Sequence, residues 1–268
     1  KFKMIKDITI GQYIPGESFI HKLDPRTKIL ITFLFIISLF IVDKFVGYIF
    51  VVAFLALVVY VAKISPRYLY KGLKPVFLLI ALTAILNIFM LREGRLLFQL
   101  GFIKIYESGI KTALFMAIRL ILLIMGTSVL TLTTSPIELT DGIERLLRPI
   151  GKEIAHELAM MMTIALRFIP TLIDETDKIM KAQKARGADF ESGGLVKKAK
   201  NLIPLLVPLF ISSFRRADEL AMAMEARCYR GGAGRTRMKV LKFTSKDFIA
   251  FGVFALLLAS TLIIRFAI

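Results

Sequence analysis

Two arginines stand in matching sequence surroundings 41 residues apart and are the clearest candidates for a binding site. The segments that end at Arg186 and Arg227 share the pattern D-x-[IL]-x-x-A-x-[KE]-A-R. A guanidinium group carries its donors in a planar fork that fits carboxylate or carbonyl oxygens. A single arginine near a helix C-terminus is usually a solvated charge. Two in equivalent places predict a pair of projections that enter two similar receptor sites.

Other patterns that could carry catalysis are incomplete. Residues 156–160, HELAM, hold half of the zinc motif H-E-x-x-H, but Met160 occupies the place of the second ligand, and the only other histidine is His21. The sequence has no G-x-x-x-x-G-K-[ST] phosphate loop, and 231–237, GGAGRTR, suits a flexible basic connection. The single cysteine, Cys228, excludes an internal disulfide. We therefore expect a non-catalytic protein without cofactor or metal.

The composition is that of a membrane protein. Hydrophobic residues make up 56% of the 268 residues, and the mean hydropathy of +0.70 is above what a soluble globular domain needs. Lysine and arginine number 37 against 20 acidic residues, an excess that the positive-inside rule explains. Long apolar runs do not suit a nucleic-acid-binding domain. The sequence therefore indicates an all-α membrane protein whose partners include the lipid bilayer and no nucleic acid.

About five apolar runs are long enough to cross a bilayer. We expect membrane-spanning helices at residues 25–42, 45–62, 75–91, 110–134 and 247–268. Asp24 suits the N-cap of the first and Pro25 its first helical position, which leaves Arg26 and Lys28 at the cytoplasmic rim. The loop 63–74 has four basic and no acidic residues, so it and the N-terminus are expected in the cytoplasm. Three segments follow: 1–134 with four spans, a cytoplasmic domain at 135–246, and a last span at 247–268.

The cytoplasmic segment is expected to be helical. A short helix should begin after a serine cap at Ser135, and two long ones should cover 152 to about 188 and 195 to about 229. The turn-rich residues between the long helices predict a hairpin or a crossed pair. Arg186 and Arg227 then lie near helix C-termini, where the helix dipole favours a cation, and Gly187 can supply a left-handed cap after the first.

The apolar middles of the two long helices are too rich for a solvated face. They predict a surface that lies against membrane or a membrane-embedded partner, although packing of the two helices on each other is the alternative. Methionine suits a surface that repacks against more than one partner. The residues singled out for this surface are Met160, Met161, Met162, Leu205, Leu206, Leu209 and Phe210.

Four motifs together resemble one protein family. They are DPRTK at 24–28, RFIPTLIDE at 167–175, AQKARGAD at 182–189 and AMEARCYRGG at 223–232. With them the chain resembles, over essentially its whole length, the T component of energy-coupling-factor transporters, a membrane subunit of ABC-type vitamin and metal importers. Each motif alone is weak and their combination is specific. One departure is Cys228, where the family often has glycine; a cap that does not need glycine would keep the same role.

The resemblance implies a force-transmitting role. In that family two cytoplasmic ATPases form a nucleotide-driven clamp, and each receives one helix end that carries an Ala-Arg-x motif. The implied ATPase-binding residues are Ala185, Arg186, Gly187, Ala226, Arg227 and Cys228. The long apolar helices would hold the substrate-binding S component in the plasma membrane of a bacterium. The chain itself would hydrolyse no ATP and bind no vitamin.

Other functions remain open at this level. A stand-alone secondary transporter or channel would use Arg119 inside the fourth span, since charges inside a membrane often line a pathway. The alternative for Arg119 is an interhelical hydrogen bond, with Asn87 as a candidate partner. A dedicated cobalt or nickel importer subunit is a further alternative. A polybasic lipid-surface receptor would explain the charge, but not the matched arginines.

Overall fold

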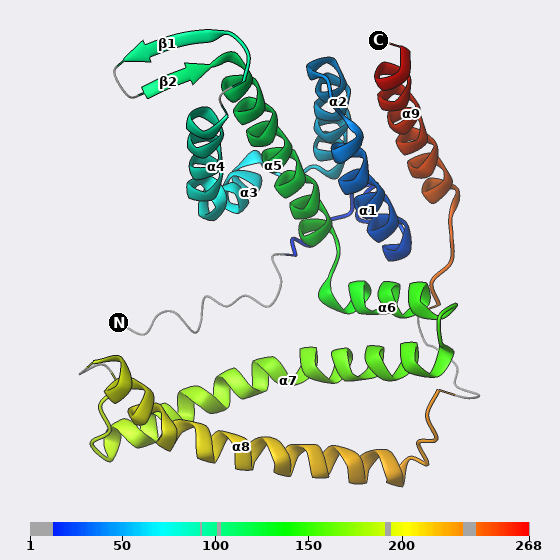
Figure 1. The fold of residues 1–268 in the computed structure, drawn as a ribbon. Coiled ribbons are helices and arrows are strands. Elements are labelled where there is room, and N and C mark those ends of the chain that lie inside the picture. Colours follow the sequence, from blue (N-terminus) through cyan, green and yellow to red (C-terminus); the bar gives the residue numbers. More distant parts are fainter. Residues whose placement is uncertain (1–12, 92, 101–102, 191–193, 233–239, 268) are drawn as a thin grey trace. The chain divides into compact units, whose positions relative to one another are not determined.

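The computed structural model describes residues 13–91, 93–100, 103–190, 194–232 and 240–267. Helices dominate this part of the chain (Figure 1). They are α1 (Pro25–Ile41), α2 (Phe45–Ala62), α3 (Pro66–Leu73), α4 (Phe77–Met90), α5 (Glu107–Thr133), α6 (Pro136–Leu147), α7 (Lys152–Ala185), α8 (Leu195–Ala226) and α9 (Ser245–Ala267). A short 3-10 turn, η1 (Lys74–Val76), joins α3 to α4, and strands β1 (Leu96–Leu100) and β2 (Ile103–Tyr106) form an antiparallel hairpin.

The chain divides into two compact units, which are described separately. The bundle unit comprises Gly11–Gly142 and Lys239–Ile268, and the hairpin unit comprises Ile143–Met238. The boundary after Gly142 falls inside α6, so this helix begins in one unit and ends in the other. The sequence-based division at 134/135 follows the end of an apolar run, whereas this one follows spatial contacts.

Within the described residues, five helical segments are long and apolar enough to cross a membrane, as many as the sequence predicts. They are Phe45–Ala62, Pro66–Met90, Glu107–Thr133, Lys152–Ala185 and Ser245–Phe266. The set differs from the predicted one. Helix α1 has 17 residues, the lower limit for a span, and is not among the five. Helix α7 meets the same measure, although the sequence places it outside the membrane.

The structure differs from the sequence-based expectation at the start of the third span and in the loop that follows it. The span expected at 75–91 corresponds to η1 and α4, and the segment that could cross a membrane starts earlier, at Pro66 of α3, with Pro75 in the 3-10 turn between the two helices. Proline lacks the N–H that a regular helix would use there and its ring crowds the preceding turn. The expected loop at 92–109 contains the β1–β2 hairpin, and α5 already begins at Glu107.

The core of the bundle unit lies between α1, α2, α5 and α9. Leu39 and Val51 are completely buried there, and Phe35 is nearly so. Glycine at position 126 of α5 makes room for the Phe35 ring, because a Cβ there would lie 2.5 Å from a ring carbon. The close approach of α1 and α5 therefore depends on this glycine.

The DPRTK motif ties the start of α1 to the start of α9. Asp24 caps α1 as predicted, since its carboxylate accepts from the Arg26 backbone N–H at 2.9 Å. The Arg26 guanidinium donates to the same carboxylate at 2.8 Å. The backbone N–H of Asp24 donates to Asp247 of α9, which in turn accepts from the backbone N–H of Thr244. The motif is thus a buried polar junction between two helices.

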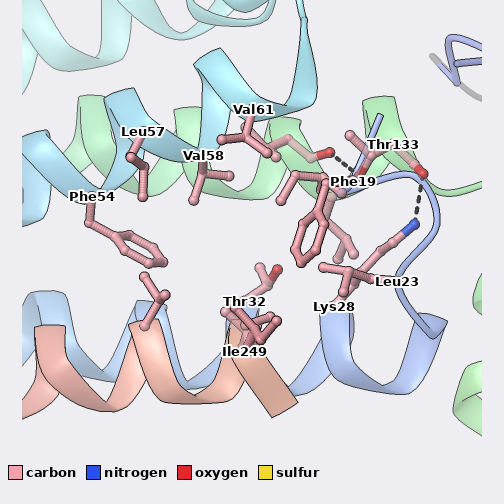
Figure 2. A pocket seen from close by; sticks show the side chains of 16 residues that line it. Phe19, Leu23, Lys28, Thr32, Phe54, Leu57, Val58, Val61, Thr133 and Ile249 are labelled. Carbon is pink, nitrogen blue, oxygen red and sulfur yellow. Dashed lines mark hydrogen bonds between the residues drawn. The ribbon is translucent and has the colours of Figure 1, made fainter. Parts of the chain in front are cut away.

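Lys28 is buried, with 6% of its surface exposed. The sequence places its amine at the cytoplasmic rim, but the Nζ atom donates to the backbone carbonyls of His21 at 3.0 Å and Thr133 at 2.9 Å. Thr133 is the last residue of α5, and a cation at a helix C-terminus is favourable. Figure 2 shows Lys28 beside Thr133 in a cavity of about 320 Å³. Apart from Lys28, Thr32 and Thr133, its lining is apolar, so the cavity offers little to a polar substrate.

Candidate docking site at two helix ends

Helices α7 and α8 form an antiparallel pair in the hairpin unit, so their C-termini lie at opposite ends of it (Figure 1). The Gln183 side chain near the end of α7 donates to the carbonyl of Pro204 near the start of α8 at 3.2 Å. Farther along, Glu175 of α7 pairs with Arg216 of α8 at 3.6 Å. The 32 residues of α8 span about 48 Å, so the two candidate arginines are held on the order of 45 Å apart.

The first helix end is a Schellman turn around Arg186. Helix α7 ends at Ala185, and Arg186 is its C-cap residue with φ −86° and ψ 7°. Gly187 follows with φ 87°, and its N–H donates to the Lys184 carbonyl at 3.0 Å. The N–H of Ala188 donates to the Gln183 carbonyl, also at 3.0 Å. These two bonds close the helix in the way that places a left-handed residue directly after the cap.

The second helix end repeats this geometry residue by residue. Helix α8 ends at Ala226, and Arg227 is the C-cap residue with φ −94° and ψ 13°. The N–H of Cys228 donates to the Glu225 carbonyl at 2.8 Å, and the N–H of Tyr229 donates to the Met224 carbonyl at 3.0 Å. Both arginines therefore leave the backbone at the same point of the same turn, which the repeated sequence pattern predicts.

Cys228 corrects one expectation about this turn. The sequence allows for a cap that does not need glycine, yet Cys228 has φ 53°, in the left-handed region that Gly187 occupies in the first turn. A residue with a Cβ is strained there by about 1 to 2 kcal/mol. The second turn thus keeps the conformation that glycine favours and accepts the strain of a larger residue.

Both arginine ends are open to a partner. The side chains of Ala185, Arg186, Ala226, Arg227 and Cys228 are exposed, as is Gly187. Within the described residues neither guanidinium has a hydrogen-bond or ion-pair partner. The alanines leave the space beside each arginine clear, so that a groove with carboxylate or carbonyl oxygens can receive the whole fork.

The apolar face predicted on these helices is largely exposed. Phe210 exposes 61% of its surface and Met161 57%, and Leu206 is exposed as well. Met160, Met162 and Leu209 are half-buried. Leu205 differs: it is 7% exposed and packs against Met180 and Phe190 within the unit, so it is not available to a partner here.

Sequence reasoning missed part of this face. Further exposed apolar side chains on α8 are Leu202, Ile203, Val207, Ile211 and Phe214. The signal was the nearly unbroken apolar run at 202–214, interrupted mainly by prolines. An exposed apolar surface of this extent marks contact with a protein or a membrane.

Comparison with known proteins identifies the family. A relative from Clostridium kluyveri, named energy-coupling factor transporter transmembrane protein EcfT, is 68% identical over 250 residues, which are 92% of this chain and 93% of the relative. The chain belongs to the EcfT family. Two more relatives of that name are similar to it: one from Thermosediminibacter oceani is 59% identical over 98% of this chain and 99% of its own, and one from Bacillus subtilis is 50% identical over 91% and 93%. The family model described as CbiQ, cobalt transport protein, matches residues 16–240.

In this EcfT family member the candidate pathway residue, Arg119, has structural partners. No cluster of three metal-ligating side chains occurs among the described residues. Arg119 in α5 donates to the Tyr48 hydroxyl at 3.1 Å and the Val42 carbonyl at 3.2 Å, and lies over the Phe40 ring. Its interhelical role is thus confirmed, but the suggested partner Asn87 is wrong. The EcfT family name describes a transporter's transmembrane component and no catalytic activity.

Proposed function

We propose that this chain is the scaffold and coupling subunit of an energy-coupling-factor importer. It binds two ABC-type ATPases through its two arginine ends, and passes their ATP-driven motion to a membrane-embedded S component that binds a vitamin. ATP hydrolysis belongs to the partner chains. The observation that carries the proposal is the identity of the two Schellman turns at Arg186 and Arg227.

Two like receptors follow from this identity. Because the backbone of both turns is the same, each arginine offers its guanidinium at the same place relative to the final helical turn. A groove that fits one end therefore fits the other. Helix α8 keeps the ends on the order of 45 Å apart, so two separate receptor sites are needed rather than one. Two ATPase subunits with equivalent grooves meet this requirement.

The exposed apolar face suits the membrane-embedded partner. Phe210 and Met161 lie on the two long helices that end in the arginine turns. A change in the spacing of the two ends would shift these helices, and with them any S component packed on the face. Methionine side chains adapt to different surfaces, which favours service to more than one S component.

The proposed setting is the plasma membrane of a bacterium, with the N-terminus in the cytoplasm. The basic loop 63–74 supports this orientation under the positive-inside rule. Protease protection of a tag fused before Lys1 in sealed vesicles tests it. A tag protected inside right-side-out vesicles agrees with the proposal, and a tag cleaved from outside contradicts it.

Charge reversal tests the docking role. The tagged chain is purified from membranes that hold its partners, as wild type, with Arg186→Glu, with Arg227→Glu and with both changes. Loss of a charge that pairs across an interface costs about 2 to 5 kcal/mol, so each reversal should weaken ATPase binding at least about 30-fold. Arg215→Glu, an exposed charge reversal in the middle of α8, is the matched control.

Uptake in the same membranes completes the experiment. We expect the double variant to insert and to keep its membrane partner, but to lose both ATPases and ATP-dependent vitamin uptake, while Arg215→Glu keeps them. Intact transport by the double variant would show that the arginine turns are ordinary helix caps. Tight vitamin binding by the purified chain alone would contradict its role as a coupling subunit.

A dedicated cobalt or nickel importer subunit is the second candidate. The observation in its favour is the family model described as a cobalt transport protein, which matches residues 16–240. Uptake of radiolabelled cobalt(II) and of radiolabelled vitamins by the same vesicles separates the two candidates.

A further inference from the structure

Three polar side chains connect the second helix end to other parts of the hairpin unit. Tyr229, which directly follows the Arg227–Cys228 turn, has its hydroxyl 3.3 Å from Nε2 of His156 at the start of α7. On the other side of that ring, Nδ1 lies 3.6 Å from a carboxylate oxygen of Glu144 at the end of α6. Glu144 is buried, with 3% of its side chain exposed. We call this chain of contacts the Tyr–His–Glu link.

The charge of the Glu144 carboxylate bears on which ring nitrogen of His156 carries the proton. A buried carboxylate beside Nδ1 favours the imidazole tautomer with the proton on that nitrogen. In that tautomer Nε2 has the lone pair that can accept from the Tyr229 hydroxyl. The same ring thus faces α6 through one nitrogen and the segment after α8 through the other.

Glycine at position 232 brings the chain against the same histidine. A Cβ at this position would lie 2.7 Å from Cδ2 of His156, closer than side chains tolerate. Gly231 just before it has φ 77°, a conformation that glycine favours. The segment that leaves the second arginine turn therefore closes over the imidazole, which independently supports a specific attachment at this point.

The first arginine end has a different attachment. Apolar packing of Met180 and Phe190 with Leu205 holds the end of α7 to the beginning of α8. The hydrogen bond from Gln183 to the Pro204 carbonyl adds to it. The two ends have matching arginine turns, but their contacts to the rest of the hairpin unit differ. Only the second has the Tyr–His–Glu link to α6 among the described contacts.

We propose that the Tyr–His–Glu link is a positioning device, through which the Arg227 end and the end of α6 move as one body when the bound ATPase changes state. This inference rests on the proposed function. Helix α6 continues through Gly142 into the bundle unit. Motion at Arg227 thus has a short route to the bundle unit, whereas motion at Arg186 must first pass along α7 or α8. The two chemically similar docking ends have unequal mechanical roles.

The test measures nucleotide-dependent hydrogen exchange in the chain purified with its ATPases. We compare the exchange of α6 amides in ADP and in a non-hydrolysable ATP analogue, for wild type and for Tyr229→Phe. Phenylalanine keeps the ring and the backbone N–H and removes only the hydroxyl. We expect the nucleotide-dependent change at α6 to fall about two- to tenfold, the usual effect of one lost hydrogen bond. ATPase co-purification and the change at the end of α7 should persist.

A second variant and two controls separate a link from general damage. Gly232→Ala pushes on the His156 ring and should reduce the α6 response as Tyr229→Phe does. Gly194→Ala is its matched control, since no atom lies within 4 Å of a Cβ there. Tyr60→Phe removes the hydroxyl of a highly exposed tyrosine and controls for the first variant. Neither control should change the α6 response.

The following results would overturn the proposed role of the Tyr–His–Glu link. A full α6 response in both Tyr229→Phe and Gly232→Ala overturns the link, as does a wild-type complex whose α6 exchange ignores the nucleotide. Failure of the docking proposal is seen separately, because the chain with Arg186→Glu and Arg227→Glu would then still bind both ATPases.

Discussion

Two substitutions at the left-handed cap positions should have opposite effects on helix-end stability. Gly187→Ala should destabilise the end of α7, and Cys228→Gly should stabilise the end of α8. Gly187 has φ 87° and Cys228 has φ 53°, and both stand directly after a candidate docking arginine. No atom lies within 4 Å of a Cβ built at position 187, so Gly187→Ala changes the backbone preference and little else. Cys228→Gly is the reverse change at an exposed site.

The expected change in the stability of each turn is the difference between two opposing free-energy contributions. A Cβ in the left-handed region costs about 1 to 2 kcal/mol. Glycine loses about 0.5 to 1 kcal/mol more conformational entropy on folding than alanine, which offsets part of this cost. The net effect is about 0.5 to 1 kcal/mol, or about two- to fivefold in the opening equilibrium of the last helical turn. Gly187→Ala should raise local opening by this factor, and Cys228→Gly should lower it.

Hydrogen exchange of two amides reports these changes. The N–H groups of Ala188 and Tyr229 close the two Schellman turns, so their exchange follows local opening. Gly194→Ala is the control: Gly194 is the N-cap residue of α8 with φ −69°, so alanine there introduces no left-handed strain and only the modest cost of a poorer N-cap. If Gly187→Ala changes exchange no more than Gly194→Ala does, the conformational argument for both turns is refuted.

Three further changes test the bundle unit. Lys28→Met removes the amine that bonds two carbonyls, and we expect it to lower the free energy of unfolding in detergent by about 2 to 4 kcal/mol; a loss below about 1 kcal/mol would contradict the buried role of the amine. Burial lowers the pKa of His21 below 6.5, so its contribution to stability is present above pH 6.5 and is lost as the pH falls through the lowered pKa; His21→Gln should flatten the dependence of Tm on pH in this range. Gly126→Ala places a methyl group 2.5 Å from the Phe35 ring and should cost about 1 to 3 kcal/mol in the same unfolding assay, and no measurable cost would contradict the tight packing of α1 on α5.

Local chemistry made several helix limits predictable. Asp24 and Pro25 mark the start of α1, and Ser135 caps α6 by accepting from the Glu138 N–H at 3.3 Å. The starts of α7 and α8 at Lys152 and Leu195 also agree with the sequence. These signals work because a cap is formed by residues within one turn of the helix end. The hairpin at 96–106 was missed, although Ile103 to Ile105 alternate in polarity, because so short a pattern is weak beside long apolar helices.

Partners that are distant in the sequence could not be predicted. The Lys28 amine binds a carbonyl 105 residues away, and Arg119 binds a tyrosine hydroxyl 71 residues away. Side-chain type and spacing predict that such groups need partners when buried, but not which ones they find. The same limit applies to His156, whose neighbours come from α6 and from the chain beyond α8.

The two helix ends at Arg186 and Arg227 show a more specific limit of prediction from sequence. The repeated sequence pattern correctly predicts two equivalent helix ends, since equal local sequences favour equal turns. At Cys228, however, residue type pointed away from a positive φ, which side chains with a Cβ rarely adopt. The hydrogen bonds of the turn decide the conformation there, against the preference of the residue.

The single cysteine of the chain, Cys228, is a natural attachment site for a spectroscopic probe. Cys228 is exposed, and its backbone is fixed between two hydrogen-bonded amides of the second turn. A fluorophore or spin label attached to this thiol would have one attachment point and a well-defined anchor, without any engineered residue. If an ATPase closes over Arg227, the label must lose solvent access and mobility together. The residue that departs from the expected glycine therefore gives the wild-type chain a direct optical or magnetic signal of docking at one end only.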